Sequence, residues 1–166
     1  MKYERFEELP VWQAAIGLAG AVYAMTEKPP FRRRYSLRDQ IERAAVSVSN
    51  NIAEGFERGT KEELLTFLYI ARGSAGEVRS MLCLFQTLRQ NIPDFPDLES
   101  DLLNLKTRTE SISKQLGAWI RALRDSSLKG ERYVTEKTRR TDAAARDREE
   151  FLKELERIRN GGQPQG

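Results

Sequence analysis

The sequence predicts an all-α protein, an antiparallel up-down-up-down four-helix bundle. Three observations support this fold class. Apolar residues recur at three- and four-residue steps over four long segments, turns rich in proline or glycine separate these segments, and no β-strand pattern occurs. The 166 residues fit one bundle over residues 1–124 and a charged extension over residues 125–166. Because the extension has few large apolar residues, we expect it to be partly disordered or helical.

The first helix is expected over residues 10–26. Pro10 suits the first turn of a helix, and apolar side chains follow on two adjacent stripes. No residue from Leu9 to Thr26 is charged, so the segment approaches the length of a membrane span. Its glycines and alanines dilute its hydropathy, however, and we expect a helix that is buried on more than one side and no membrane span.

The second and third helices have recognisable ends. Ser36 and Asp39 have the spacing of a capping box at the start of the second helix, and Gly55 is a natural C-terminal stop. Thr60 and Glu63 form the clearest capping box of the chain, and they predict a third helix that ends near residue 90. This third helix is apolar on two sides, which is typical of a helix that packs on two sides.

The fourth helix is expected over residues 97–124, after a turn that contains Pro93 and Pro96. Acidic residues at its start and Arg121 and Arg124 at its end complement the helix dipole. A further amphipathic segment, residues 149–160, could form a helix that would be marginal alone.

Composition excludes several function classes. The chain has no histidine, which excludes Ser-His and Cys-His nucleophile pairs and histidine metal sites. Its one cysteine, Cys83, excludes an internal disulfide and a cysteine-cluster zinc site. We therefore expect a cytoplasmic protein with no enzymatic activity, no cofactor and no metal. The formal net charge of +3 marks a mildly basic protein, suited to binding or assembly.

Three motifs resemble the four helix bundle protein family, which includes the proteins encoded in intervening sequences of bacterial 23S ribosomal RNA genes. They are FEELPVWQ at residues 6–13, RAAVSVSNNIAEG at residues 43–55, and matches over residues 61–77. The resemblance implies a homopentameric ring of four-helix subunits without established enzymatic activity. A related branch is the accessory variability determinant of diversity-generating retroelements, a basic pentameric barrel that associates with a reverse transcriptase and nucleic acid. The chain departs from the family pattern at Ser49, where proline is usual, and at Arg32–Arg34, where the loop is often mixed or acidic.

Basic residues of the first three helices and their loops are the candidate nucleic-acid contacts, because arginine matches the shape of a phosphate and stays charged. They are Arg32, Arg33, Arg34, Arg38, Arg43, Arg58, Lys61, Arg72 and Arg79. The first hypothesis is a non-catalytic protein that associates with RNA or DNA, most readily RNA, through these residues. The second is a protein–protein adaptor, for example an accessory subunit of a reverse transcriptase, that uses the segment 149–160.

Two further sets of residues carry expectations. Asn51, Glu54 and Gly55 belong to the central motif. Asn51 and Glu54 are either RNA contacts or structural residues, with Asn51 bonded to the backbone and Glu54 paired with Arg72 or Arg43. The small residues around Gly73 predict close approach of another helix. The expected contacts between subunits are Leu18, Val22, Ile70, Gly73, Met81 and Leu84.

Overall fold

The computed structural model describes residues 3–28, 31, 34–91, 98–126 and 152–153. A 3-10 helix over Phe6–Glu8 precedes four α-helices. The α-helices are α1 (Pro10–Thr26), α2 (Tyr35–Glu57), α3 (Lys61–Asn91) and α4 (Glu99–Asp125). The all-α four-helix prediction is therefore confirmed.

The chain divides into two compact units, Met1–Gly130 and Glu131–Gly166. All four helices belong to the first unit. Of the second, only Leu152 and Lys153 are described, and both are helical. The remainder of the predicted segment 149–160 lies outside the described residues.

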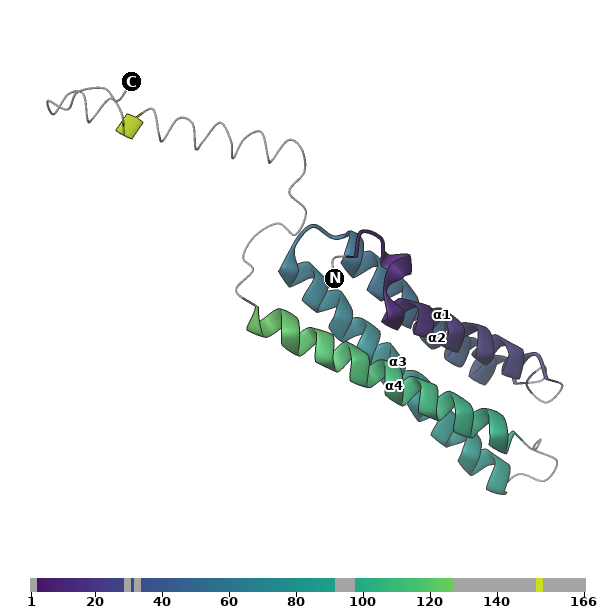
Figure 1. Cartoon of the computed structure of the whole chain (residues 1–166). Coiled ribbons are helices and arrows are strands. Elements are labelled where there is room, and N and C mark those ends of the chain that lie inside the picture. The colour runs from purple at the N-terminus through teal and green to yellow at the C-terminus, as the bar shows by residue number, and fades with distance from the viewer. Residues whose placement is uncertain (1–2, 29–30, 32–33, 92–97, 127–151, 154–166) are drawn as a thin grey trace, which may run out of the picture. The chain divides into compact units, whose positions relative to one another are not determined.

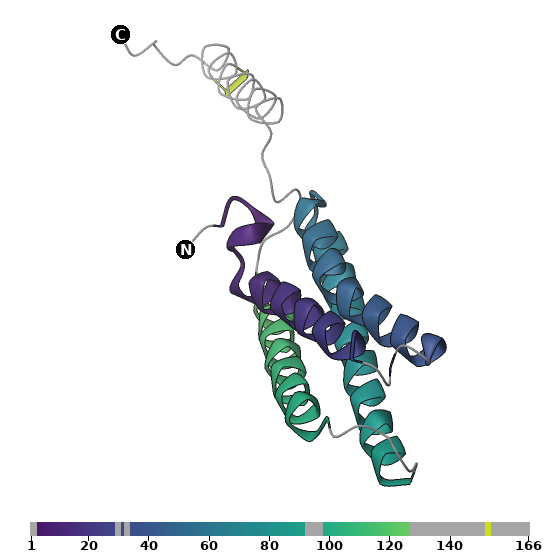
Figure 2. The same ribbon diagram turned by 90° about the vertical axis from the view of Figure 1, so that its right-hand side faces the viewer.

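Each helix of the bundle packs against two neighbours. Helix α1 contacts α2 and α4, and α3 contacts the same two helices, so α1 and α3 lie at diagonally opposite corners. Figure 1 shows the helices side by side, and Figure 2 shows α1 between α2 and α4. Each described helix therefore presents one face to the core and another outward.

The core is built from the apolar stripes that the sequence predicts, and it includes three residues that we had expected between subunits. Leu18 and Val22 are fully buried, and Met81 is 6% exposed. The single bundle covers these side chains, so they are core residues and do not form the outer surface expected of them.

The core also holds a buried polar residue, Thr109, whose hydrogen-bonding capacity is used: its hydroxyl donates to the carbonyl of Leu105 at 2.6 Å.

The outward face of α1 corrects a second expectation. The helix is buried along one stripe only, and on its other side Ile16 is 45% and Tyr23 43% exposed. That face also carries Gly17 and Gly20, where an added Cβ atom would meet nothing within 4 Å. This side of α1 thus stays largely exposed in the single bundle, and at its edge Arg108 of α4 donates to the carbonyl of Gly17 at 3.2 Å. Within the described residues, no helix is both long and apolar enough to cross a membrane.

The two predicted capping boxes have different outcomes. At the start of α3, the amide of Glu63 donates to the Thr60 hydroxyl at 3.2 Å, and that hydroxyl donates to the Glu63 carboxylate at 2.8 Å. At the start of α2, the helix begins one residue early, at Tyr35, and its N-cap Arg34 makes no side-chain cap hydrogen bond. Ser36 therefore lies inside the first turn and does not cap the helix.

Gly55 does not end α2, which continues to Glu57. The residue is buried at the contact with α3, where an added Cβ atom would lie 2.7 Å from the Cβ atom of Phe67. Glycine is needed here because the two backbones approach closely. The motif residue thus positions α2 against α3.

Candidate nucleic-acid interface

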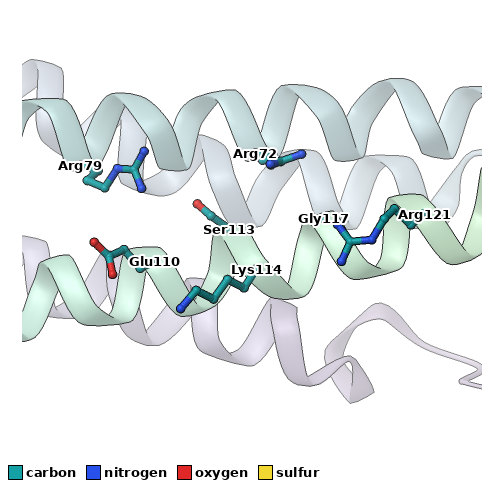
Figure 3. A pocket seen from close by; sticks show the side chains of 7 residues that line it. All are labelled: Arg72, Arg79, Glu110, Ser113, Lys114, Gly117 and Arg121. Carbon is teal, nitrogen blue, oxygen red and sulfur yellow. The ribbon is translucent and has the colours of Figure 1, made fainter.

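A groove between α3 and α4 gathers positively charged side chains. The hollow measures about 360 Å³ and lies along the two helices (Figure 3). Its walls carry four cations and one carboxylate, that of Glu110. The lining residues are Arg72, Arg79, Glu110, Ser113, Lys114, Gly117 and Arg121. We refer to this hollow as the α3–α4 groove.

Helical spacing explains why the cations align. Arg72 and Arg79 are seven residues apart on α3, and Lys114 and Arg121 are seven apart on α4. Seven residues are close to two turns, so each pair lies on one helix face with a rise of about 10.5 Å. Because α3 and α4 are antiparallel, Arg72 lies across from Gly117, and Arg79 lies across from Glu110 (Figure 3).

The floor of the groove is narrow at Gly117. A Cβ atom at this buried glycine would lie 3.6 Å from the Cζ atom of Arg72 and 3.6 Å from an Nη atom of Arg121. The guanidinium groups of two different helices therefore converge on one point. We refer to this arrangement as the arginine clamp.

The four groove cations have no counter-ion within the part of the chain that the structure describes. Arg72 and Arg79 have no carboxylate three or four residues away along α3, whereas Lys114 has Glu110 and Arg121 has Asp125 four residues away on α4 without forming an ion pair. Glu110 lies in the groove but makes no ion pair with a described residue. The groove therefore has an excess of positive charge that an anion can satisfy.

Three of the predicted contacts on or next to α2 are, in contrast, paired with carboxylates. Arg38 bonds to Glu27 at 2.6 Å and to Glu42 at 2.8 Å. Arg43 bonds to Asp39 at 3.0 Å, and Arg58 bonds to Glu54 at 2.8 Å. The hydrogen bond to Glu42 raises the pKa of Arg38, and the hydrogen bond to Glu54 raises the pKa of Arg58.

The remaining predicted contacts are spread over the chain. Lys61 donates to the carbonyl of Ser126 at 2.8 Å, which ties the start of α3 to the end of α4. Arg34 is the half-buried N-cap of α2, and Arg32 and Arg33 lie outside the described residues. Of the seven predicted basic contacts that the structure describes, Arg72 and Arg79 alone line the α3–α4 groove.

The central motif has mainly structural contacts. Asn51 donates to the carbonyl of Ser47 at 2.7 Å, as its structural interpretation requires. Glu54 pairs with Arg58, and not with Arg72 or Arg43 as expected. The reason is geometric, because Glu54 and Arg58 are one turn apart on the outside of the bundle.

Lys114 and Arg121 are groove residues that sequence reasoning missed. Arg121 had been assigned only to the dipole at the end of the fourth helix. The repeated seven-residue spacing of cations in two neighbouring helices was a usable signal, since antiparallel packing aligns such pairs across a groove. Among the described residues, no group of three His, Cys, Asp or Glu side chains is placed to hold a metal ion.

The sequence motifs and the bundle agree with a known family. The family model for the 23S rRNA-intervening sequence protein matches residues 7–118. The chain belongs to this family. The match covers α1, α2 and α3 and most of α4, including every groove residue except Arg121.

A solved structure supports the fold of this family member. It is the crystal structure of a protein with unknown function from the S23 ribosomal protein family from Bacteroides thetaiotaomicron. The identity is 18% and the TM-score 0.57, and the alignment covers 66% of this chain and 97% of that chain. At this identity the likeness shows the fold alone. No curated protein matches the chain.

Proposed function

We propose that the protein is a non-catalytic, homo-oligomeric four-helix bundle that associates with RNA through the α3–α4 groove. The main observation in support is that the four cations of this groove have no carboxylate partner among the described residues. The fold and the family are consistent with such a role.

The chemistry of the groove favours contacts to the nucleic-acid backbone. Three of its four cations are arginines, whose planar fork matches phosphate oxygens. None of the described lining residues is aromatic, so the groove offers no stacking platform for bases. Binding through phosphates fixes the position of a strand but does not read its sequence. We therefore expect little sequence preference.

The outer faces of α1 and α3 support assembly of several copies. Ile70 and Leu84 on α3 are 46% and 40% exposed, and Ile16 and Tyr23 expose a comparable surface on α1. Gly73 lies on the exposed face of α3, and an added Cβ atom there would meet nothing within 4 Å. A glycine inside a helix costs about 1 kcal/mol relative to alanine, and no described residue of the same chain packs on Gly73 to account for this cost.

The positions of these faces favour a ring. The exposed faces of α1 and α3 are different surfaces at diagonally opposite corners of the bundle. Contact between the α1 face of one copy and the α3 face of the next is therefore heterologous. Heterologous contacts close into rings when the rotation allows it, and the family resemblance favours five subunits. A ring would repeat the α3–α4 groove in every copy, so weak phosphate contacts would add up to useful avidity.

Paired charge reversals test the RNA-binding proposal. We expect Arg72→Glu/Arg121→Glu to weaken binding to labelled RNA about tenfold or more, because it removes phosphate contacts and adds repulsion. The matched control is Arg43→Glu/Arg58→Glu, which changes the net charge equally but alters residues that are already paired. Equal losses in both variants would contradict a specific groove.

Salt dependence gives a second test. If four phosphates are contacted, the logarithm of affinity should fall with the logarithm of salt concentration with a slope of about −3 for a single strand. Absence of binding to labelled RNA at about 50 mM salt would overturn the proposal. That result would favour the alternative, a protein–protein adaptor such as an accessory subunit of a reverse transcriptase.

A further inference from the structure

We propose that the α3–α4 groove accepts single-stranded nucleic acid in preference to a duplex, with one backbone phosphate held in the arginine clamp above Gly117. This inference rests on the proposed function and specifies which form of nucleic acid the groove selects and where its backbone lies. It starts from the convergence of Arg72 and Arg121, which come from opposite walls.

The arginine clamp has the geometry of a phosphate site. Two like charges that converge on one point repel each other, and no carboxylate of the described chain lies between them. A phosphate placed between them would accept hydrogen bonds from both guanidinium groups and cancel this repulsion. Each arginine can present two parallel N–H groups, so the clamp can bind both free oxygens of a phosphodiester.

A second pair of cations continues the path. Arg79 is seven residues from Arg72, which is a rise of about 10.5 Å along α3, and Lys114 is three residues from Gly117, which is a rise of about 4.5 Å along α4. Ser113 lies beside them and makes no side-chain hydrogen bond with any residue that the structure describes. Its hydroxyl is thus available to a backbone oxygen. The groove therefore has contacts at two levels for one continuous strand.

The width of the groove discriminates between one strand and two. The axes of packed helices lie about 8–10 Å apart, so the surface groove above the contact of α3 and α4 is narrow, and the backbone of one strand lying in it can contact both walls. In an A-form RNA duplex the backbone of each strand is fixed on a helix by pairing with the second strand, so a duplex can contact only the rim of this groove. Proteins that bind single strands without sequence preference combine a positively charged groove that follows the backbone with aromatic stacking, and of these two features the described lining supplies the charged groove.

Gly117 keeps the floor of the clamp open. A methyl group at this position would lie at ordinary van der Waals distance from both guanidinium groups, 3.6 Å from an atom of each. A larger side chain would occupy the place that we assign to the phosphate. Substitution at Gly117 therefore blocks the clamp sterically while it leaves every charge in the protein unchanged.

The experiment compares two RNA probes with the full-length protein. One is a labelled, unstructured RNA of about 12 nucleotides, and the other is the blunt duplex of the same sequence. Fluorescence anisotropy at one salt concentration should show that the wild-type protein binds the single strand about tenfold tighter than the duplex. Gly117→Leu should reduce single-strand affinity about tenfold and leave duplex affinity unchanged.

The matched control is Ala118→Leu, which adds equal bulk at the next residue of α4, an exposed position that does not line the groove. It should bind like the wild type. Circular dichroism and thermal unfolding report whether each variant folds. If Gly117→Leu does not fold, Gly117→Ala replaces it, and its single methyl should weaken single-strand binding about threefold.

The outcomes separate this inference from the proposed function. Equal affinity of the wild-type protein for the single strand and the duplex would overturn single-strand selection. The proposal that RNA binds in the groove would still hold if Arg72→Glu/Arg121→Glu abolished binding of both probes. A folded Gly117→Leu with unchanged single-strand affinity would overturn the clamp. Absence of binding to either probe would overturn both proposals.

Discussion

Arg72 on α3 and Arg121 on α4 direct their guanidinium groups at the same buried residue, Gly117, and each has an atom 3.6 Å from the position of a Cβ atom there. Neither arginine makes an ion pair with a described residue, whereas Arg38, Arg43 and Arg58 all do. The position of charge relative to its counter-ions, and not the number of arginines, therefore distinguishes the α3–α4 groove from the rest of the bundle.

Removal of the one carboxylate in the groove should strengthen RNA binding. Glu110 faces Arg79 across the groove, so its charge opposes that of an incoming phosphate (Figure 3). We expect Glu110→Gln to raise affinity about two- to fivefold, because a charge interaction near a protein surface is worth about 1 kcal/mol when solvent screens it. The change is measured by anisotropy titration with single-stranded RNA.

The control for this substitution is Glu57→Gln, at an exposed position on α2. It changes the net charge by the same amount outside the groove, so it should alter affinity much less. If both variants strengthen binding equally, net charge alone sets the affinity, and Glu110 has no special place in the groove.

The close approach of α2 and α3 predicts a stability effect at Gly55. An added Cβ atom would lie 2.7 Å from the Cβ atom of Phe67, which cannot rotate away because it is attached to the backbone. We expect Gly55→Ala to lower the free energy of unfolding by about 1–3 kcal/mol, although alanine is the better helix former. Chemical denaturation measures the change.

The matched substitution is Gly76→Ala on α3, where an added Cβ atom meets nothing within 4 Å. It should raise the free energy of unfolding by about 0.5–1 kcal/mol, because only the backbone entropy of glycine is lost. Stabilisation of the protein by Gly55→Ala would contradict the packing described for α2 and α3.

The connection between α1 and α2 is anchored by one aromatic residue. Phe31 is fully buried, and its ring meets the ring of Phe85 on α3 edge to face, with 5.0 Å between centroids. We expect Phe31→Ala to cost about 3–5 kcal/mol of unfolding free energy, since it leaves a cavity and removes the aromatic pair. Tyr35→Ala is the control, because Tyr35 is 75% exposed and its loss should cost less than about 0.5 kcal/mol. Equal denaturation midpoints would show that Phe31 does not anchor the connection.

The helices were predictable from the sequence because their ends carry strong local signals. Pro10 sets the start of α1, and the hydroxyl of Thr60 caps α3 as expected. Ser36 misled the prediction because a capping residue must precede the first turn, and here that turn begins at Tyr35. Gly55 misled it for a different reason: a glycine that serves a helix contact has the same sequence appearance as one that ends a helix.

The candidate site was predictable only in part, because pairing between helices decides which charges stay open. Arg38, Arg43 and Arg58 each pair with a carboxylate one turn away. Lys114 and Arg121 also have a carboxylate one turn away, Glu110 and Asp125, but form no ion pair with it, so sequence spacing alone does not separate the paired arginines from the groove cations. The alignment of Lys114 and Arg121 with Arg72 depends on the register between α3 and α4, which hydrophobic periodicity does not specify. Which apolar residues are buried is equally hard to predict from the sequence, since Leu18 and Ile16 are both apolar but only Leu18 lies in the core.

The exposed face of α3 predicts how assembly can be disrupted. Ile70 and Leu84 are two heptads apart on this face, which we propose contacts α1 of a neighbouring copy. A carboxylate at each position would be buried without a partner in that contact, so Ile70→Glu/Leu84→Glu should dissociate the oligomer into chains of 19.1 kDa. Light scattering coupled to size exclusion measures the mass.

Thr107→Glu/Ser111→Glu, at exposed positions on α4, adds the same charge outside the proposed contact and should leave the mass unchanged. A wild-type mass of one chain at micromolar concentration would contradict assembly itself, and an unchanged mass in the α3 variant would place the contact elsewhere.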